Sequence, residues 1–458
     1  MSWVDFAGKR TKRNMEKKAR IVLVPYPAQG HVTPMVQLAL ALRDLEFDPV
    51  LVVPDYLHLK IMPHIQPNYG VSFISIPDGL SENEPRDFFT IAFSMENSMP
   101  AHLERIIRSF SQDGRVACVV VDFLASWAIE VAGRCGVPVA GFWPAMLAMY
   151  RICVAIPDMI KVGLIDEFGS PQQKCAGFVL PGQPMFSLED LPWLVGNSVA
   201  RKSRFAFWLR TLERSRSLKW LLVNSFPEER DGYREQLQPT HNNGQSIFPV
   251  GALIKHTESK HPSFWEEDMS CLDWLGKQKP GSVIYVSFGS WVAPIGDEKI
   301  QELALGLEAT KRPFILVLAP MWRKGLPVGF LERVGEQGKV VSWAPQKELL
   351  QREEIGCYLT HCGWNSTMEA IQGGKLLLCY PVSGDQFVNC TYIVDVWGVG
   401  EKLNRIGRRD VEEGVRSIME EGGEMQQRMI KLKTRAVGKE GNLRALASLK
   451  AFTNDLDK

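Results

Sequence analysis

Short β-branched runs alternate with longer amphipathic segments along most of the chain. This alternation is typical of a parallel sheet whose strands are joined by crossover helices. The segment "VTPMVQLALALRDL" (32–45) shows the helical part of the pattern, because its apolar positions recur at helical spacing. In the first half of the chain the predicted strands are 20–26, 49–54, 71–77, 116–122, 137–144 and 220–226.

The same pattern starts again in the second half, after a segment that lacks it. Residues 236–265 are rich in Pro, Asn, Gly and His, and we interpret them as the connection between two domains. No short internal repeat is visible, so we predict an α/β protein with two doubly wound domains, at 20–245 and 246–440. The strands predicted in the second domain are 282–290, 313–320, 339–345, 355–362 and 376–382.

Length, composition and charge favour a protein that acts on small molecules. A chain of 458 residues is too long for one ordinary core, and two domains imply a cleft between them. Hydrophobic residues make up 45% and charged residues 23%, as in globular proteins, and the net charge is only +1. This charge argues against electrostatic binding of nucleic acid or of a membrane surface.

Cysteine use and the terminal residues indicate a cytoplasmic protein. The nine cysteines are irregularly spaced without a C-x-x-C pair, so we expect reduced thiols and neither a zinc site nor a disulfide framework. Residues 1–19 are strongly basic and predict a disordered tail, with nuclear targeting or contact with anionic lipid as the alternative. Because no run reaches 18 apolar residues, we expect no transmembrane segment.

The loops that follow the predicted strands are where a ligand should bind, because parallel sheets gather ligands at the carboxyl ends of their strands. Neither a G-x-G-x-x-G nor a Walker A motif is present, which argues against an NAD enzyme or a P-loop NTPase. The loop "THCGWNS" (360–366) offers an alternative anion site: Gly363 would permit a sharp turn, and a helix would begin near Trp364. Taken alone, Asn365 and Ser366 could equally be ordinary helix caps.

A longer match narrows these alternatives. The 44 residues from Trp343 to Gln386 resemble the signature box of the plant family 1 UDP-glycosyltransferases. The stretches "PYPAQGHVTPM", "VVVDF", "WLLVNSFPE" and "CLDWLGKQKPGSVIYVSFGS" extend the resemblance over nearly the whole chain. It implies the GT-B architecture, in which two facing Rossmann-like domains hold a nucleotide sugar in their cleft, and a C-terminal helix (441–458) that packs back onto the first domain. The positions that fit the box are Trp343, Ala344, Pro345, Gln346, His361, Gly363, Trp364, Asn365, Ser366, Glu369, Gly374, Pro381, Asp385 and Gln386.

The resemblance also implies a role for each donor-site residue. Trp343 would stack on uracil, with Ala344 and Gln346 lining the base and ribose. Glu369 would accept hydrogen bonds from the ribose hydroxyls, since one carboxylate can take two neighbouring donors. His361, Asn365, Ser366 and Ser290 would hold the diphosphate, and Asp385 and Gln386 would bind the sugar together with Trp364. A glutamine at the last position favours glucose, so the expected donor is UDP-glucose.

Catalysis requires an acceptor oxygen that is made nucleophilic. The resemblance implies that His31, in the first strand-to-helix loop, is the general base and that Asp122 orients it, as in a Ser-His-Asp arrangement with the substrate in place of serine. Alone, a loop histidine is more often exposed or capping, and an aspartate at a strand end is usually an N-cap. Single displacement would invert the α-linked donor to a β-glycoside.

No metal or other cofactor is expected beyond the donor substrate. Metal-dependent glycosyltransferases hold the diphosphate through Asp-x-Asp, and the only such triplet here is Asp455-Leu456-Asp457 near the C-terminus. Two departures from the box, Arg352 for histidine and Lys375-Leu376 for Val-Pro, lie outside the ligand positions, so local packing should change and donor binding should not.

The acceptor side is less specific. Two segments rich in Met, Trp and Phe, 142–160 and 191–215, would either line an apolar acceptor pocket or pack in the core. The leading hypothesis is a monomeric, inverting UDP-glucosyltransferase acting on a small lipophilic acceptor, phenolic, flavonoid, terpenoid or hormone-like. The alternatives are a catalytically silent nucleotide-sugar-binding protein and another GT-B enzyme, such as a sugar epimerase.

Overall fold

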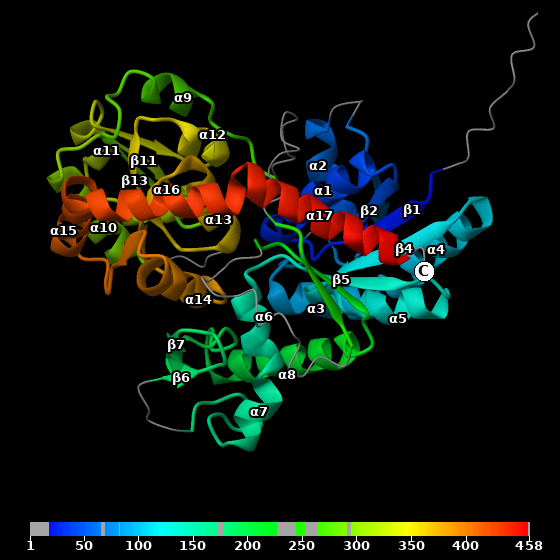
Figure 1. Ribbon diagram of the computed structural model, residues 1–458. Helices are drawn as coiled ribbons and strands as arrows, with labels where there is room; N and C mark the ends of the chain where they lie inside the picture. The colour runs from blue at the N-terminus through cyan, green and yellow to red at the C-terminus, as the bar shows by residue number, and fades with distance from the viewer. Residues whose placement is uncertain are drawn as a thin grey trace, which may run out of the picture.

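The computed structural model describes residues 18–65, 69–81, 83–172, 177–226, 244–251, 264–290 and 295–456. Two parallel sheets, each with helices on both faces, form its two halves (Figure 1). The predicted basic tail up to residue 17 and most of the predicted connection lie outside these residues. None of the described helices combines the length and apolar character needed to cross a membrane.

The N-terminal sheet is parallel throughout. In sheet order, its strands are β3 (Ser72–Ile76), β2 (Asp48–Pro54), β1 (Arg20–Val24), β4 (Val116–Asp122), β5 (Val139–Trp143), β8 (Trp220–Val223) and β9 (Ser246–Pro249). The helices of this half are α1 (Gln29–Asp44), α2 (Asp55–Ile61), α3 (Phe88–Asn97), α4 (Pro100–Asp113), α5 (Trp127–Arg134), α6 (Leu147–Val154), α7 (Ile156–Lys161) and α8 (Ser198–Ser215).

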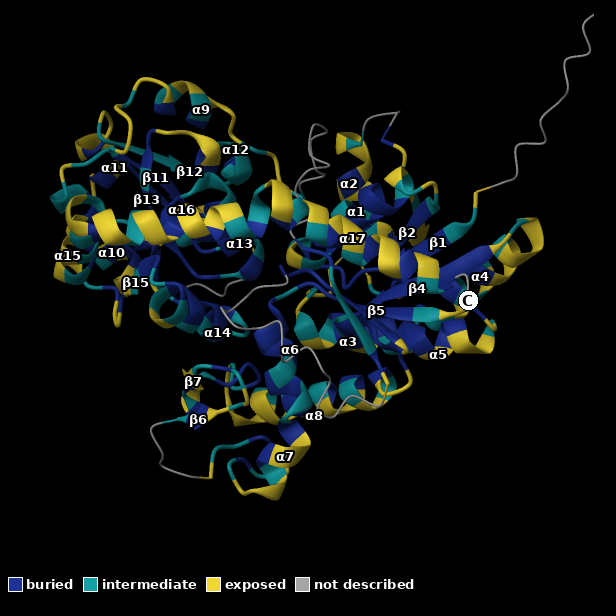
Figure 2. Cartoon of the chain, in the orientation of Figure 1, coloured by how far each residue is buried: buried dark blue, intermediate teal, exposed yellow. Residues whose placement is uncertain are grey.

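Strand β1 shows why these apolar runs form a central strand. Successive side chains of a strand point to opposite faces of the sheet. Ile21 and Leu23 lie in one buried core, with α1, while Val22 and Val24 lie in a second core on the other face. A run with no polar position is therefore what a sheet covered on both sides requires, and central strands such as β4 are coloured as buried in Figure 2.

The C-terminal sheet repeats the same order. Its strands, in sheet order, are β12 (Gly338–Val341), β11 (Phe314–Val317), β10 (Val283–Ser287), β13 (Ile355–Thr360), β14 (Leu376–Cys379) and β15 (Gly400–Lys402). Both sheets thus have the third-second-first-fourth-fifth order of a Rossmann-like fold. In this order the topological switch point, where ligands bind, lies beside the first strand. The helices are α9 (Ser270–Leu275), α10 (Asp297–Ala309), α11 (Phe330–Arg333), α12 (Gln346–Gln351), α13 (Trp364–Gly373), α14 (Gln386–Thr391), α15 (Arg408–Arg416), α16 (Gly423–Val437) and α17 (Lys439–Leu456).

Some short strands of the structure were not predicted from the sequence pattern. Strand β9 lies inside the segment interpreted as a connection, yet it pairs with β8 in the N-terminal sheet. We therefore place the domain boundary after β9 rather than after residue 245. β15 and the small antiparallel pair β6 (Phe178–Val179) and β7 (Met185–Phe186) are also unpredicted, because runs of two or three residues carry no periodicity.

Helix α17 lies across the N-terminal half, while α16, directly before it, covers the C-terminal half (Figure 1). Phe452 of α17 is fully buried, with its ring centroid 6.1 Å from Trp220 and 5.7 Å from Phe248. Burying a side chain of this size stabilises the fold by about 1.5–3 kcal/mol. Asp455 accepts a hydrogen bond from the Trp220 indole N–H at 2.7 Å. The last helix thereby ties the second half of the chain to the first sheet.

The two halves also contact each other directly. The indole N–H of Trp364 donates to the carbonyl of Asn224 at 2.6 Å, and the Tyr392 hydroxyl donates to Gln183 Oε1 at 2.7 Å. Both pairs are buried and join residues more than a hundred positions apart. These contacts hold the two halves against each other. The carboxyl ends of the first strands of both sheets then point toward a common space.

Candidate active site

A cleft of about 720 Å³ opens between the two halves. Its walls come from the carboxyl ends of the strands in both sheets and from the loops that follow them. Every site residue predicted from the sequence lines this cleft: His31, Asp122, Ser290, Trp343, Ala344, Gln346, His361, Gly363, Trp364, Asn365, Ser366, Glu369, Asp385 and Gln386. The structure thus brings together residues that lie up to 355 positions apart.

His31 and Asp122 form a hydrogen-bonded pair on the N-terminal wall. His31 Nδ1 lies 2.8 Å from Asp122 Oδ2, and the other carboxylate oxygen accepts the backbone N–H of Leu124 at 2.9 Å. Asp122 is fully buried, whereas 23% of the His31 side chain is exposed. A carboxylate that accepts from Nδ1–H leaves Nε2 as the basic nitrogen. The pair can therefore take a proton from a group in the cleft.

From the sequence we placed His31 in a loop, but in the structure His31 belongs to the first turn of α1. The helix begins at Gln29, and Pro34 lies inside it. Because proline has no N–H, the carbonyl of Gly30 lacks its helical donor four residues later. The Asn365 side-chain amide, from the opposite half, donates to this carbonyl at 3.0 Å. A helix that tolerates proline here thereby provides a contact across the cleft, next to His31.

The loop after β13 makes its turn at a different residue from the one predicted. Gly363 has φ −59°, which any residue can adopt, whereas Cys362 has φ +66°. Glycine is needed at 363 for space: an added Cβ would lie 2.5 Å from His361 Nε2. On the other side of the same ring, a Cβ at Gly289 would lie 2.6 Å from Nε2, and Gly289 has φ +75°. The two glycines therefore hold the imidazole of His361 between them.

His361 is a neutral hydrogen-bonding group in this setting. Its side chain is buried, and burial lowers its pKa to about 4. Its Nδ1 is buried and has no hydrogen-bond partner among the described residues. A neutral imidazole still offers one N–H donor, so His361 can bind an anion without carrying a charge of its own.

The amino end of α13 faces the same space without a side-chain cap. The N-cap residue is Gly363, and Asn365 and Ser366 are the second and third residues of the helix. The capping role considered for Asn365 and Ser366 is therefore wrong. No acidic residue occupies the first turn. The free N–H groups and the positive end of the helix dipole remain available to an anion.

Gln346 is the centre of a polar network beneath the cleft. Its carbonyl oxygen accepts hydrogen bonds from the hydroxyls of Tyr285 (3.1 Å) and Tyr358 (3.0 Å). Its amide nitrogen donates to Ser366 Oγ (2.9 Å) and Glu369 Oε2 (2.7 Å). Both ends of the amide are engaged, so Gln346 orients Ser366 and Glu369 in addition to lining the cleft. Burial raises the pKa of Glu369 to about 7, although the hydrogen bond from Gln346 acts to lower it.

We call His361, Ser290, Asn365, Ser366 and the amino end of α13 the anion cradle; a carboxylate and an amide lie beside it, from Asp385, the N-cap residue of α14, and from Gln386, its first residue. Burial raises the pKa of Asp385, while hydrogen bonds from Asn389 Nδ2 (2.8 Å) and from the Trp364 backbone N–H oppose that shift. His31 lines the opposite wall of the same cleft, and its interaction with Asp385 lowers this pKa further. Gln386 Oε1 accepts two backbone N–H groups, each at 2.9 Å, from residues 382 and 383. The indole of Trp364 is buried against the other half, which leaves its backbone as the polar group beside Asp385.

The remaining residues predicted for the donor site, Trp343, Ala344 and Ser290, also lie on the C-terminal wall. Trp343 is partly exposed, and its ring centroid lies 5.9 Å from that of Trp265. Ala344 is buried directly after it. Ser290 is exposed at the end of the loop that carries Gly289. An aromatic face together with hydroxyl and N–H donors on one wall matches a ligand with a flat ring and an anionic centre.

The N-terminal wall is largely apolar, and the sequence identified it only in outline. The two Met- and aromatic-rich segments are divided between both of the roles considered for them: Trp143, Met149 and Trp208 line the cleft, whereas Ile156 and Phe205 are buried in the core. The lining residues that we did not single out from the sequence include Tyr26, Phe88, Leu124, Val195 and Arg204. Only their position after a strand or within an aromatic-rich segment could have indicated them.

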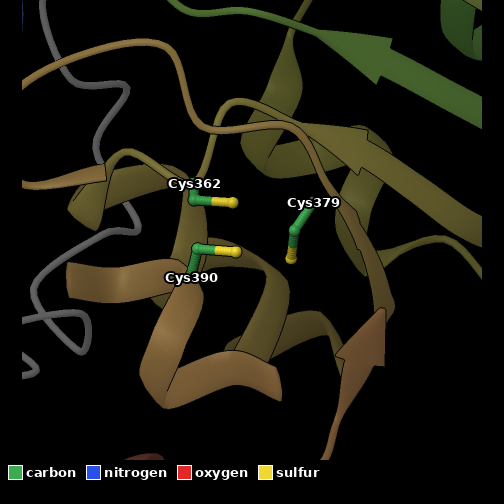
Figure 3. Close-up of side chains that lie close together, drawn as sticks. All are labelled: Cys362, Cys379 and Cys390. Atoms are coloured by element: carbon green, nitrogen blue, oxygen red, sulfur yellow. The ribbon is translucent and has the colours of Figure 1, made fainter. Parts of the chain in front are cut away.

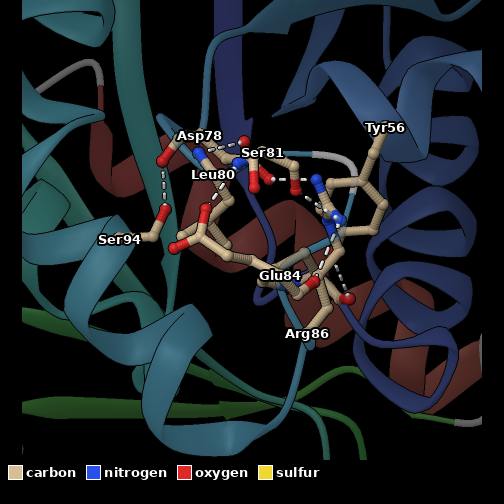
Figure 4. Close-up of polar contacts among 8 residues, drawn as sticks. Tyr56, Asp78, Leu80, Ser81, Glu84, Arg86 and Ser94 are labelled. Carbon is tan, nitrogen blue, oxygen red and sulfur yellow. Dashed lines mark hydrogen bonds and ion pairs between the residues drawn. The ribbon is translucent and has the colours of Figure 1, made fainter.

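A polar cluster fixes the segment that carries Phe88 into the cleft (Figure 4). Arg86 packs its guanidinium over the ring of Tyr56, 4.5 Å from the centroid, and pairs with Asp78 at 3.4 Å. Ser94 of α3 donates a hydrogen bond to the carbonyl of Asp78. These contacts join α2, α3 and the loop between β3 and α3, so Phe88 begins a helix whose position is set on two sides.

Three cysteines that are distant in sequence meet behind the donor side of the cleft. Cys362, Cys379 and Cys390 come from the loop after β13, from β14 and from α14, and their sulfur atoms all lie within 4.8 Å of one another (Figure 3). Hydrogen bonds from the other two thiols lower the pKa of Cys390. Structural zinc sites have four ligands, and no further His, Cys, Asp or Glu of the described residues completes this group. We interpret the cluster as small side chains packed in the core.

The two departures from the signature box contact each other away from the cleft. The ammonium of Lys375 donates to the carbonyl of Arg352 at 2.6 Å and to that of Ile355 at 3.0 Å. Arg352 in turn pairs with Glu354 at 2.8 Å. Burial lowers the pKa of Lys375 to about 8. The departures therefore form one local arrangement, and neither Arg352 nor Lys375 lines the cleft.

Comparisons with known proteins agree with this site. A family model described as "UDP-glucoronosyl and UDP-glucosyl transferase" matches residues 261–433. Over 461 residues the chain is 49% identical to UDP-glycosyltransferase 82A1 of Arabidopsis thaliana, which covers 96% of this chain and 99% of that relative. The chain belongs to the plant family 1 UDP-glycosyltransferases. The family predicted from the signature box is therefore confirmed, and with it glycosyltransferase activity.

Solved structures support the same assignment of this UDP-glycosyltransferase. Phytolacca americana UGT2, complexed with UDP-2fluoro-glucose and pterostilbene, matches with a TM-score of 0.81 and 25% identity, covering 96% of this chain and 100% of that one. A UDP-glucosyltransferase from Polygonum tinctorium capable of glucosylating indoxyl, in complex with 3,4-dichloroaniline, matches with a TM-score of 0.80 and 26% identity, covering 96% and 99%. The GT-B fold, two facing Rossmann-like domains, is confirmed.

Proposed function

We propose that this UDP-glycosyltransferase transfers glucose from UDP-glucose to a small lipophilic acceptor, with inversion, and forms a β-glycoside. The observation that carries the proposal is the position of the His31–Asp122 pair, which faces the anion cradle across one cleft. Asp385 and Gln386, beside the cradle, would bind the glucose hydroxyls. The relative solved with UDP-2fluoro-glucose supports this donor.

In this proposal the C-terminal wall binds the UDP part. Trp343 stacks on uracil beside Ala344, and Glu369, oriented by Gln346, accepts the ribose hydroxyls. His361, Ser290, Ser366, Asn365 and the amino end of α13 with its Gly363 turn hold the diphosphate. These groups supply N–H and O–H donors and a helix dipole where negative charge develops on departing UDP. The proposed chemistry therefore uses no metal ion.

The N-terminal wall would activate and place the acceptor. His31 Nε2 takes the proton of the acceptor hydroxyl as its oxygen attacks the anomeric carbon, and the bond to the UDP oxygen breaks on the opposite side. Asp122 stabilises the imidazolium that forms. A silent binding protein would have no use for a buried carboxylate aligned with this histidine. We further propose a cytoplasmic monomer, since the eight cysteines of the described part are all free thiols.

The decisive experiment incubates the purified protein with UDP-sugars and with phenols, flavonoids, terpenoids and plant hormones. We expect transfer from UDP-glucose in preference to other UDP-sugars, and a β-linked product by NMR. Binding of UDP-glucose without transfer to any acceptor would favour the silent binding protein. An α-linked product would contradict the inverting mechanism.

The raised pKa of Glu369 predicts how nucleoside binding depends on pH. Ribose hydroxyls donate to the ionised carboxylate, so binding requires loss of the proton that Glu369 holds below its pKa of about 7. Between pH 7 and pH 5, the Kd of uridine should rise by up to about tenfold per pH unit. Uridine replaces UDP in this titration because a phosphate group also titrates near pH 6. The Glu369→Gln variant should give a flat profile, and an unchanged slope in that variant would assign the dependence to another group.

A further inference from the structure

Arg204 is a cation in the acceptor half of the cleft without a carboxylate within 4 Å among the described residues, and the charge of Asp87 acts on it from farther away. Arg204 lies on α8, is partly buried and lines the cleft beside Phe88 and Trp208. Its Nε is buried without a hydrogen-bond partner in the part of the chain that the structure describes. Its observed partners are aromatic: the guanidinium carbon lies 4.6 Å from the ring centroid of Phe88 and 5.1 Å from that of Phe89.

Neighbouring arginines on the same helix are paired. Arg214 lies 2.7 Å and Arg210 lies 3.7 Å from Glu96. The acid closest in sequence to the aromatic contacts of Arg204 is Asp87, and one of its oxygens already accepts the N–H groups of Phe89 and Thr90, both at 2.9 Å, at the start of α3. The chain therefore has acids near α8 that pair with other groups, and it leaves the arginine facing the cleft unpaired.

A partly buried guanidinium without an ion-pair partner is energetically unfavourable unless a ligand pairs with its charge. Removing a charge from water without pairing it costs several kcal/mol, roughly, in real proteins, and contact with the partly buried ring of Phe88 and the exposed ring of Phe89 returns only about 0.5–1 kcal/mol each. Among the described residues of the N-terminal wall, Arg204 is the one side chain with a permanent positive charge, since the others are apolar or belong to the His31–Asp122 pair and its polar neighbours. Its charge therefore favours a ligand that carries a negatively charged group at this position.

We propose that Arg204 binds a carboxylate of the acceptor, so that the preferred acceptors are hydroxy acids with an apolar body. This inference rests on the proposed function, in which the reacting hydroxyl lies at His31. The aromatic side chains Phe88, Trp143 and Trp208 contact the body of the acceptor, and the planar guanidinium binds the two carboxylate oxygens side by side. The carboxylate is thereby kept away from His31, so the hydroxyl and not the acid is glucosylated.

The route from Arg204 to the base passes Tyr26. The Tyr26 ring centroid lies 5.2 Å from that of His31. On its other side, the Tyr26 ring centroid lies 6.2 Å from that of Phe88, the ring over which the guanidinium of Arg204 packs. The cation, the phenol and the imidazole therefore line one continuous wall, along which an elongated acceptor can lie.

Matched pairs of acceptors test the proposal. The probes are 4-hydroxybenzoate, 4-hydroxyphenylacetate and 4-hydroxycinnamate, each compared with its own methyl ester, which keeps the hydroxyl and the ring and loses the charge. With the wild-type enzyme and UDP-glucose, we expect at least one acid to have a KM about tenfold or more below that of its ester. Arg204→Gln should raise the KM of that acid about tenfold while leaving the ester and the Kd of UDP within about twofold.

The control is Arg210→Gln, which removes an arginine from the same helix but outside the cleft lining, and which should leave both members of each pair unchanged. Equal binding of every acid and its ester, measured by quenching of tryptophan fluorescence as well as by KM, would overturn the proposal. So would an equal effect of Arg204→Gln on acid and ester, or a loss of UDP affinity, which would assign Arg204 to the donor. Failure of the proposed function is distinguishable, because it abolishes transfer to acids and esters alike while binding of the acid still depends on Arg204.

Discussion

His31→Ala is expected to lower kcat by about 100-fold or more, because general-base catalysis contributes typically about 10²–10⁴-fold. The substitution removes the imidazole that lines the wall opposite Asp385 and hydrogen-bonds to Asp122. The Kd of UDP should stay within about twofold, since the donor contacts come from the other wall. Steady-state kinetics with UDP-glucose, together with calorimetry of UDP binding, measure the two effects separately.

His102→Ala provides the matched control, since His102 is partly exposed on α4 and does not line the cleft. Asp122→Asn should also lower kcat while leaving UDP binding intact, because an amide can present its N–H to Nδ1 and favour the wrong tautomer. Wild-type turnover in His31→Ala would reject the assignment of the base. A large loss of UDP affinity would show instead that the substitution disturbs the contact between Asn365 and Gly30.

Glu369→Ala should raise the Kd of UDP by about 10- to 100-fold at pH 8, where the carboxylate of the wild-type protein is ionised. Hydrogen bonds to a charged group contribute about 1.5–3 kcal/mol, and each 1.4 kcal/mol is about tenfold in affinity. The variant also leaves the Gln346 amide with one acceptor fewer. Isothermal titration with UDP gives the change directly.

The control for Glu369→Ala is Glu353→Ala, an exposed carboxylate outside the cleft. Because Gln346 also hydrogen-bonds to Ser366, a general collapse of the network would disturb the diphosphate contacts too. Inorganic pyrophosphate should therefore bind Glu369→Ala as it binds the wild type. Unaltered UDP binding in the variant would remove the ribose assignment, and a parallel loss of pyrophosphate binding would assign the effect to the network.

The strands that build the cleft follow from local patterns. A strand such as β4 (Val116–Asp122) is an unbroken apolar run that ends in a polar residue, and both features are carried by the residues themselves. Parallel sheets then place all such ends on one edge. This is why the sequence alone indicated that Asp122, His361 and the residues after them lie close together. The role of each residue, in contrast, was inferred from the family resemblance.

The same local reasoning misplaced two details. It assigned the turn to Gly363, because glycine is the residue that most readily adopts positive φ, whereas Cys362 adopts it and Gly363 makes room for His361. It also placed His31 in the loop before the helical segment 32–45, whereas the helix begins at Gln29. In both cases a contact with a residue distant in sequence, His361 with Gly289 or Asn365 with Gly30, decides the outcome.

Periodicity and turn residues were sufficient for the α/β class, for the two-domain division and for the edge at which ligands bind, since each depends on neighbours along the chain. The saturated amide of Gln346, the raised pKa of Glu369, the three thiols that meet in the core and the unpaired Arg204 depend on which side chains surround a group in space. Burial and pairing are properties of those surroundings, so only the folded chain reveals them, and they are the properties on which the proposed donor binding and acceptor choice rest.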